Sequence, residues 1–137
     1  MPICYLNTDL DLTAPRDLTP LAAALKIHGV RALHVTAGDD GLWYAIFETD
    51  EQFQEPEPNI AAMLTAIESL SESALDDWRS CTCREFNIGY DCGSEPWAFN
   101  QGLSADTLRR TAAAATSLRI TLYPPTAGEE AVPAPQA

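Results

Sequence analysis

Basic residues are scarce in this sequence. Eight Lys and Arg residues stand against 20 Asp and Glu residues in a chain of 137, which gives a formal net charge of -12. A field of this sign repels phosphate backbones and anionic lipid surfaces, so nucleic acid and membranes are not expected as direct ligands. The same field accelerates encounter with an oppositely charged molecule, and a basic protein partner is therefore favoured.

Long apolar runs are also missing. No stretch approaches the roughly 18 consecutive apolar residues that a membrane-spanning helix needs. Residues 1–12 (MPICYLNTDLDL) lack the basic segment, apolar run and small-residue cleavage site of a secretory signal. We therefore expect a cytoplasmic protein.

Familiar catalytic motifs are absent as well. The sequence contains no GxSxG, HExxH, GxxxxGK[ST] or GxGxxG, so we predict no catalytic residue, cofactor or metal, and we do not expect an enzyme. The cysteines, which a cytosol would keep reduced, are Cys4, Cys81, Cys83 and Cys92. Cys81 and Cys83 do not have the paired spacing of zinc knuckles, and nothing in the sequence fixes a distance from Cys92 to His34. A redox or metal role for Cys81, Cys83 and Cys92 stays open.

What the sequence does contain is enough apolar material for a core. Hydrophobic residues make up 46% of the chain, and a chain of this length buries roughly two-thirds of its unfolded surface. Residues 1–125 are interpreted as a single domain. Residues 126–137, rich in Pro, Ala and Glu, are predicted to form a disordered tail.

Hydrophobic periodicity predicts an α+β domain. Alternating or β-rich segments predict strands at residues 3–12, 30–36, 42–49, 84–92 and 118–123. Capping residues and helical spacing predict helices after Thr19, Asn59 and Ser104, the last one running to about Thr116. The second helix bends or restarts at Ser71 or Ser73, and the prolines and carboxylates of residues 50–58 predict an exposed loop before it.

The predicted order is β-α-β-β-α-β-α-β. Its first six elements match the split βαβ arrangement of ferredoxin-like folds, and one further helix and strand are appended. We expect a mixed or antiparallel sheet with helices on one face, which leaves the other face free.

Two sets of residues are candidates for binding a partner. The acidic candidates, which lie mostly in predicted loops and are not interleaved with lysines, are Asp39, Asp40, Asp50, Glu51, Glu55, Glu57, Asp76 and Asp77. They form either a docking surface or a simple solubilising excess of acid. The aromatic-loop candidates are Trp97, Phe99 and Asn100, which either anchor a partner or fold back over the sheet.

A second acidic group lies outside these loops. Asp9, Asp11 and Asp91 are expected at solvated strand ends rather than around a hard cation, since carboxylates are mostly exposed.

The C-terminal third carries a resemblance. Phe86 to Tyr90 (FNIGY), the aromatic loop, Gly102 to Ser104, a helix and residues 118–123 together resemble a family of small uncharacterised bacterial proteins. Some proteins of this kind are associated with contact-dependent toxin systems as immunity proteins. The resemblance implies a binding role and supplies no catalytic residues.

The leading functional interpretation is an acidic protein-binding module, in its most specific form an immunity or inhibitor protein that neutralises a basic partner. A nucleic-acid mimic is the first alternative, although its carboxylates should be spaced regularly along helices rather than gathered in loops. The second alternative is a small ligand-binding or thiol-dependent enzyme domain using Cys92, His34 and the Trp97 loop. Both a monomer and a homodimer are compatible with the sequence.

Overall fold

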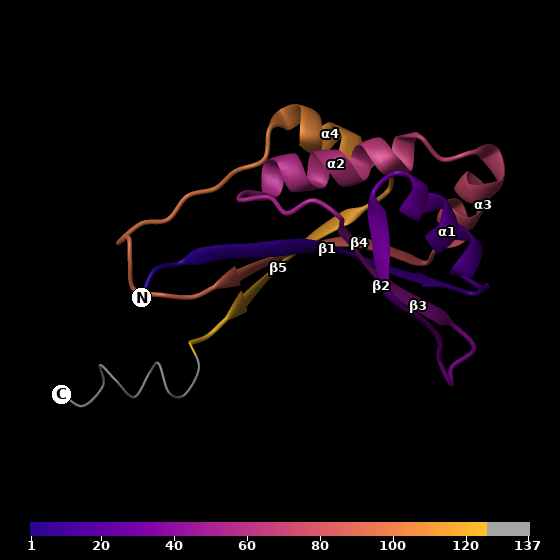
Figure 1. The fold of residues 1–137 in the computed structure, drawn as a ribbon, viewed down its shortest axis with the longest axis horizontal. Helices are drawn as coiled ribbons and strands as arrows, with labels where there is room; N and C mark the ends of the chain where they lie inside the picture. The colour runs from indigo at the N-terminus through magenta and orange to yellow at the C-terminus, as the bar shows by residue number, and fades with distance from the viewer. Residues whose placement is uncertain (126–137) are drawn as a thin grey trace.

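A computed structural model describes residues 1–125, in which helices lie on one side of a five-stranded sheet (Figure 1). The predicted tail, residues 126–137, lies outside the described residues. The strands are β1 (Cys4–Ala14), β2 (Val30–Ala37), β3 (Trp43–Thr49), β4 (Cys83–Asp91) and β5 (Ser117–Tyr123). The helices are α1 (Thr19–Ile27), α2 (Pro56–Glu68), α3 (Glu72–Ser80) and α4 (Ala105–Ala113).

The strand order confirms the ferredoxin-like core. The order across the sheet is β2-β3-β1-β4-β5, and the pairings β2–β3, β3–β1 and β1–β4 are all antiparallel. β5 is parallel to β4. A parallel neighbour needs a crossover rather than a hairpin, and α4 supplies it. The β4–α4–β5 unit is thus the appended part of the fold, and the sheet is mixed.

The core lies between the sheet and the helices because β1 alternates cleanly. Leu10 and Leu12 are buried, whereas Asp9 and Asp11 point to the opposite face and are only half-buried. From the helix side, α2 buries an apolar stripe against this surface; its members are Ile60, Met63, Leu64 and Ile67. One face of the sheet is therefore apolar and covered, and the other is polar and open.

The start of α2 corrects the prediction. The helix begins at Pro56 rather than after Asn59, because a proline in the first turn lacks only an N–H that would have no helical partner. The predicted loop of residues 50–58 is correspondingly shorter. Asn59 is not a cap but a fully buried residue within the helix.

Other helix ends follow local chemistry. The side chain of Ser71 accepts a hydrogen bond from the Ala74 N–H, so α3 is a separate helix and not a bend in α2. Ser104 caps α4 as predicted, through the Thr107 N–H. α4 ends at Ala113, earlier than predicted, because Ala115 adopts a left-handed conformation with φ 53°.

Asn59 is the centre of a buried polar network. Its Oδ1 accepts from the Tyr5 hydroxyl at 2.7 Å and from the Thr8 N–H at 3.2 Å, and its Nδ2 donates to Thr49 Oγ1 at 3.0 Å. A bulge between Tyr5 and Asn7 lets both Tyr5 and Thr8 face the core. Burial raises the pKa of Tyr5 to about 12. The network fixes α2 against β1 and the end of β3.

None of the helices within residues 1–125 is long and apolar enough to cross a membrane.

Candidate functional site

The segment joining β4 to α4 presents one tryptophan wholly to solvent. Trp97 is 99% exposed, so it does not fold back over the sheet. Phe99 behaves differently: its ring lies edge-on to Tyr90 with centroids 5.8 Å apart, and Tyr90 in turn contacts Tyr5 at 5.6 Å. Asn100 is exposed beside them. Of the predicted aromatic pair, Phe99 thus joins the packed aromatic residues and Trp97 stands free.

Both ends of this segment, which we call the Trp97 loop (residues 92–104), are attached to the rest of the domain. Near its start, the Ile3 N–H donates to the Glu95 carbonyl at 2.8 Å, and the N-terminal ammonium pairs with the Glu95 carboxylate at 3.1 Å. Near its end, Gln101 Nε2 donates to the Gln54 carbonyl at 3.5 Å. Trp97 therefore projects from a loop held at both sides.

Glu57 holds the C-terminal end of the loop. Its carboxylate accepts hydrogen bonds from the Ser104 N–H at 2.8 Å, the Ser104 hydroxyl at 3.0 Å and the Thr107 hydroxyl at 2.7 Å. These donors lower the pKa of Glu57, the Ser104 N–H first among them. A carboxylate at a helix N-terminus is also favoured by the helix dipole. Glu57 thus joins α2 to the start of α4 and has a structural use.

A pocket of about 340 Å³ opens beneath the Trp97 loop. Its walls come from the N-terminal segment, the end of β4, the loop and β5, and its lining residues are Ile3, Tyr90, Asp91, Cys92, Gly93, Phe99, Gln101, Ile120 and Leu122. Most of these side chains are apolar, so the pocket suits an apolar side chain or a small apolar molecule.

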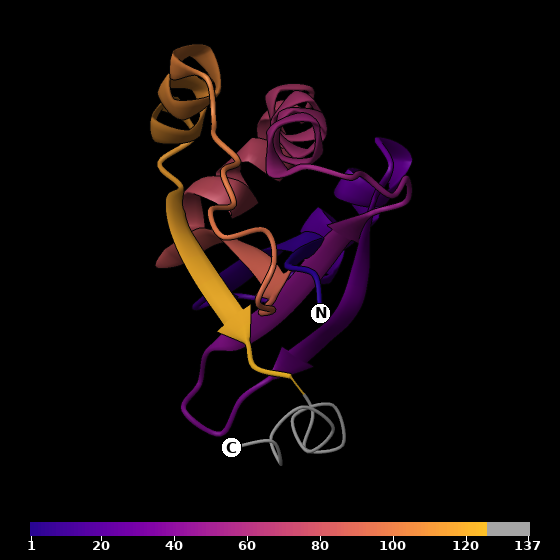
Figure 2. The same cartoon turned by 90° about the vertical axis from the view of Figure 1, so that its left-hand side faces the viewer.

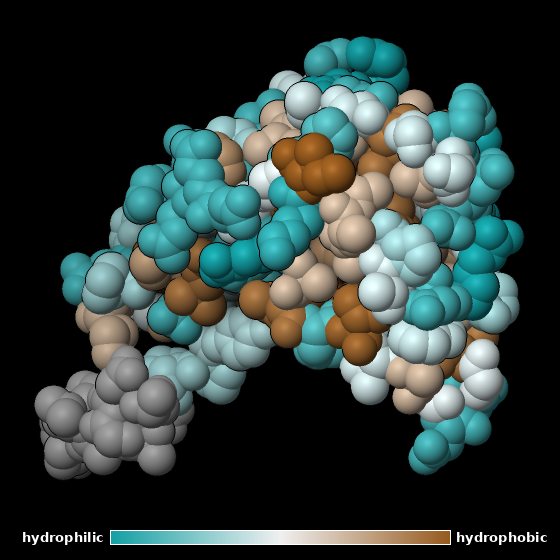
Figure 3. Space-filling view, turned by 45° about the vertical axis from the view of Figure 1, so that its right-hand side comes forward, coloured by the Kyte–Doolittle hydropathy of each residue, from teal (hydrophilic) through white to brown (hydrophobic). Residues whose placement is uncertain are grey.

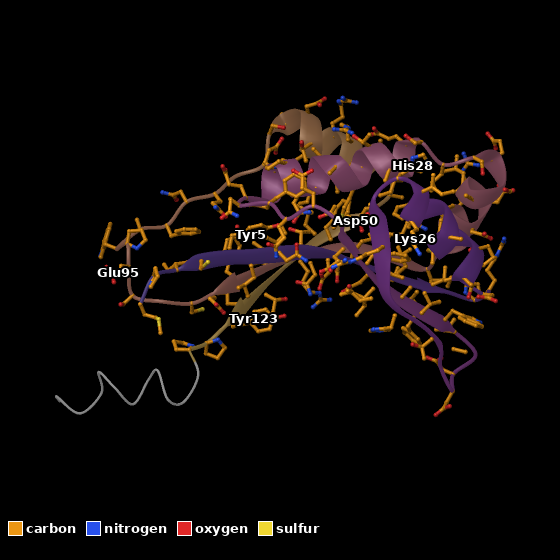
Figure 4. The ribbon with its side chains drawn as sticks, viewed as in Figure 1. Tyr5, Lys26, His28, Asp50, Glu95 and Tyr123 are labelled. Atoms are coloured by element: carbon orange, nitrogen blue, oxygen red, sulfur yellow. The ribbon has the colours of Figure 1, made fainter. Side chains whose placement is uncertain are left out.

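The predicted acidic residues do not form one surface. Asp39 and Asp40 lie at the tip of the β2–β3 hairpin, Asp50 and Glu51 follow β3, Glu55 precedes α2, and Asp76 and Asp77 lie on α3. In Figure 4, Asp50 lies near His28 at the α1–β2 junction, far from Glu95 in the Trp97 loop. Only the Glu55–Glu57 end of the acidic segment adjoins the Trp97 loop.

Besides Glu57, three of these carboxylates are also used within the fold, and Asp76 pairs with Arg79 at 3.7 Å. Asp40 accepts from the Tyr44 hydroxyl and from the Leu42 N–H, and both bonds lower its pKa. Asp77 pairs with Arg16 at 3.1 Å. The surface over α1 and the hairpin is mostly hydrophilic, with separate hydrophobic residues rather than one continuous patch (Figure 3). It offers no second aromatic anchor comparable to Trp97.

The open face of the sheet gathers a carboxylate group that the prediction missed. Asp9 and Asp11 lie mid-strand rather than at strand ends, and Glu48 and Glu85 flank them across the strand pairs. Burial raises the pKa of Asp11, with repulsion from Glu85 as the next cause, and burial also raises that of Asp9. The signal was in the alternation of β1 after Thr8, where Asp9 and Asp11 fall on the side opposite Leu10 and Leu12. Asp91 does not join this group.

The charges on this face are partly paired within the sheet. Arg119 binds Glu85 at 2.6 Å from the β5 side, and Arg31 binds Glu48 from the β2 side. Among residues 1–125, no set of three or more His, Cys, Asp or Glu side chains is arranged to hold a metal ion. The face is therefore a polar surface with ion pairs at both margins.

The thiols are dispersed. Cys81 is buried, and burial raises its pKa to about 11. His34 lies in a cross-strand row with Asp11 and Glu85, whereas Cys92 is seven residues beyond Glu85, which is about 20 Å along a strand. The thiolate–imidazole pair considered for the enzyme alternative therefore does not form in this structure.

Comparison with known proteins adds no relative. No family model matches the chain, and no curated protein and no solved structure matches it either. The resemblance of the C-terminal third to small bacterial proteins stays a prediction.

Proposed function

We propose that this protein is a binding module that captures a basic protein partner, with Trp97 as the anchor of the contact. The observation that carries the proposal is the 99% exposure of Trp97 on a loop attached at both sides. Tryptophan is strongly enriched among residues that dominate interface energies, and a fully exposed one gains the most from being covered. When the partner is a toxin or enzyme domain, such binding makes the protein an inhibitor or immunity protein.

The charge distribution supports the choice of a basic partner. The chain has no Lys or Arg between Arg31 and Arg79, and none between Arg84 and Arg109. The second of these stretches includes the whole Trp97 loop, and the first includes the Glu55–Glu57 segment beside it. An excess of acid over base around an aromatic anchor steers a cationic surface toward it, even though the acids do not form one patch and Glu95 is paired with the N-terminal ammonium.

The pocket under the loop gives the contact a second apolar element. It lies beside the anchoring segment and includes Phe99. A partner that covers Trp97 can place an apolar side chain in this pocket, and the two contacts together would bury the centre of the interface.

The test is affinity capture from the source organism with matched baits, followed by calorimetry with the purified partner. Wild-type protein is compared with Trp97→Ala and with Ile27→Ala, which removes an exposed apolar side chain from α1. We expect Trp97→Ala to weaken binding by about 30-fold, the size of a hot-spot loss of about 2 kcal/mol. Ile27→Ala should bind as the wild type does.

Salt and competition complete the test. Rising ionic strength should weaken the complex, since screening removes the attraction between an acidic module and a basic partner. Competition by double-stranded DNA for the same partner site would instead support the nucleic-acid mimic. A partner bound equally well by Trp97→Ala would contradict the proposal.

A further inference from the structure

β5 is a free sheet edge with apolar residues. It pairs with β4 on one side, and no other described strand lies beyond it (Figure 2). Its pairing with β4 runs without a bulge from Ser117 to Tyr123. Ile120 and Leu122 are 65% and 62% exposed, unusually high for large apolar residues in a sheet. Edges of this kind are ready to pair with another strand.

The direction of the free backbone groups follows from the parallel ladder. The Cys92 N–H donates to the Tyr123 carbonyl at 2.8 Å, so Tyr123 directs its backbone groups toward β4. In a strand, alternate residues direct both N–H and C=O to the same side. Arg119 and Thr121 therefore also face β4, and Leu118, Ile120 and Leu122 direct theirs outward.

These outward-facing residues also share a side-chain direction. The register places Leu118, Ile120 and Leu122 beside Phe86, Ile88 and Tyr90 of β4. Phe86 and Ile88 are core residues, so the three β5 side chains lie on the helix side of the sheet. They form an apolar row that the helices do not cover.

The sequence of the edge is symmetric about Ile120. If a second β5 pairs antiparallel with the first and Ile120 faces Ile120 of the other copy, Leu118 of each chain faces Leu122 of the other. Each of the three outward residues in each chain then uses one N–H donor and one C=O acceptor, which gives about six hydrogen bonds between the two chains. Shifting the centre to Leu118 or Leu122 leaves outward residues unpaired.

The other edge of the sheet is protected. β2 has a register shift between Ala32 and His34, and Arg31 lies on it. Bulges and charged side chains are common devices that prevent edge pairing. β5 has neither bulge nor carboxylate, and its one charge, Arg119, is neutralised by Glu85. The absence of acidic residues from β5 matters for pairing with a second copy, because the chain as a whole has a net charge of -12.

We propose that two copies of this chain pair through β5, antiparallel and centred on Ile120, to form one continuous sheet. A second copy is the favoured occupant because the edge is complementary to itself in backbone groups and in side chains. α4 stands over the same edge (Figure 2) and its Leu108 is exposed, so the helix layer extends the apolar surface.

The dimer does not require the basic partner, and although Ile120 and Leu122 also line the pocket under the Trp97 loop, salt separates the two proposals. Two copies of the same acidic chain repel each other, so rising salt should strengthen the dimer. A complex with a basic partner should weaken under the same change. Failure of one proposal therefore leaves the other intact.

The experiment measures the oligomeric state of the full chain by sedimentation equilibrium, from low micromolar to near-millimolar concentration. The test variant is Ile120→Lys, and the control is Leu33→Lys on β2, where Leu33 is 51% exposed. Both change the net charge equally. Ile120→Lys should weaken dimerisation by about tenfold or more, because like charges that face each other across a strand pair are destabilising. Leu33→Lys should leave it unchanged.

Amide exchange supplies a second readout. The amides of Arg119 and Thr121 should be protected in monomer and dimer alike, whereas those of Leu118, Ile120 and Leu122 should be protected only in the dimer. A wild-type protein that stays monomeric throughout the range overturns the proposal, whether or not the Ile120 amide is protected. Equal dimerisation by the two lysine variants also overturns it.

Discussion

Replacing Asn59 with leucine should lower the free energy of unfolding by about 4 kcal/mol, because leucine cannot make the hydrogen bonds that tie α2 to the sheet. The Thr8 N–H is buried, and Asn59 Oδ1 accepts its hydrogen bond at 3.2 Å. Without that oxygen the donor is left unpaired inside the core. This single loss is expected to cost about 1–3 kcal/mol.

The remaining cost comes from two further bonds. Tyr5 loses its bond to Asn59 and keeps its contact with Thr8 Oγ1 at 2.6 Å, and Thr49 loses the Asn59 donor and keeps its own bond to the Glu51 carbonyl. Each loss is a net effect of about 0.5–1.5 kcal/mol, because partners remain. For a domain of this length, about 4 kcal/mol corresponds to a fall in Tm of roughly 10–15 °C.

The assay is urea unfolding followed by circular dichroism, with Tyr5→Phe as the matched variant. Tyr5→Phe removes one hydroxyl and leaves the Thr8 N–H paired with Asn59, so its cost should be only about 1 kcal/mol. The reasoning would be refuted if Asn59→Leu cost no more than Tyr5→Phe. It would also be refuted if Asn59→Leu lowered the free energy of unfolding by less than about 1 kcal/mol, where about 4 kcal/mol is expected.

Three further predictions concern single side chains. Burial is the chief cause that raises the pKa of Asp11, so ionisation of this carboxyl lowers the stability of the fold at pH values above the usual pKa range of aspartate. Asp11→Asn should therefore stabilise the fold at neutral pH and have little effect at acid pH in urea unfolding. The control Asp39→Asn on the hairpin should give no such pH-dependent gain. In native protein near neutral pH, iodoacetamide should modify the exposed thiols well before Cys81, whose pKa is about 11, and mass spectrometry showing equal rates would contradict the burial argument. Iodide should quench Trp97 emission and spare Trp78, which is 4% exposed, and a Trp97→Phe variant that is quenched as strongly as the wild type would contradict the described loop.

Much of the fold follows from local patterns in the sequence. The strands lie within about two residues of their predicted bounds, because alternation on β1 and β4 reports directly which face is buried. The order of elements then leaves few ways to arrange them, and the ferredoxin-like core results. Helix ends were less accurate, since Pro56 and Ala115 act through backbone geometry that periodicity does not describe.

The candidate site was harder to predict because it depends on which residues meet across the fold. Asn59 is of a residue type that often caps helices, but it lies in the core. Glu57 is of a type that is usually solvated, but it accepts hydrogen bonds from Ser104 and Thr107. For the aromatic loop the sequence favoured covering the sheet over standing free, and for Trp97 this was wrong. Only the three-dimensional position of the loop distinguishes these outcomes, and it leaves Trp97 in solvent.

The carboxylates on the open face of the sheet were also hard to predict from sequence alone. The sequence grouped Asp9 and Asp11 with Asp91, yet their actual neighbours Glu48 and Glu85 come from strands that are distant in the sequence. Strand register, rather than composition, brings the four together. Once the strand order is known, the alternation of each strand is enough to place them on one face.

The central claim, that Trp97 anchors a basic partner, is tested most directly by the emission of Trp97 during titration with that partner once capture has identified it. The titration uses a variant in which Trp43 and Trp78 are replaced by phenylalanine, so that only one indole reports. The account predicts a blue shift and loss of iodide quenching that saturate with the calorimetric Kd, because an exposed indole becomes buried. Saturated binding that leaves the emission and the quenching of Trp97 unchanged would contradict it.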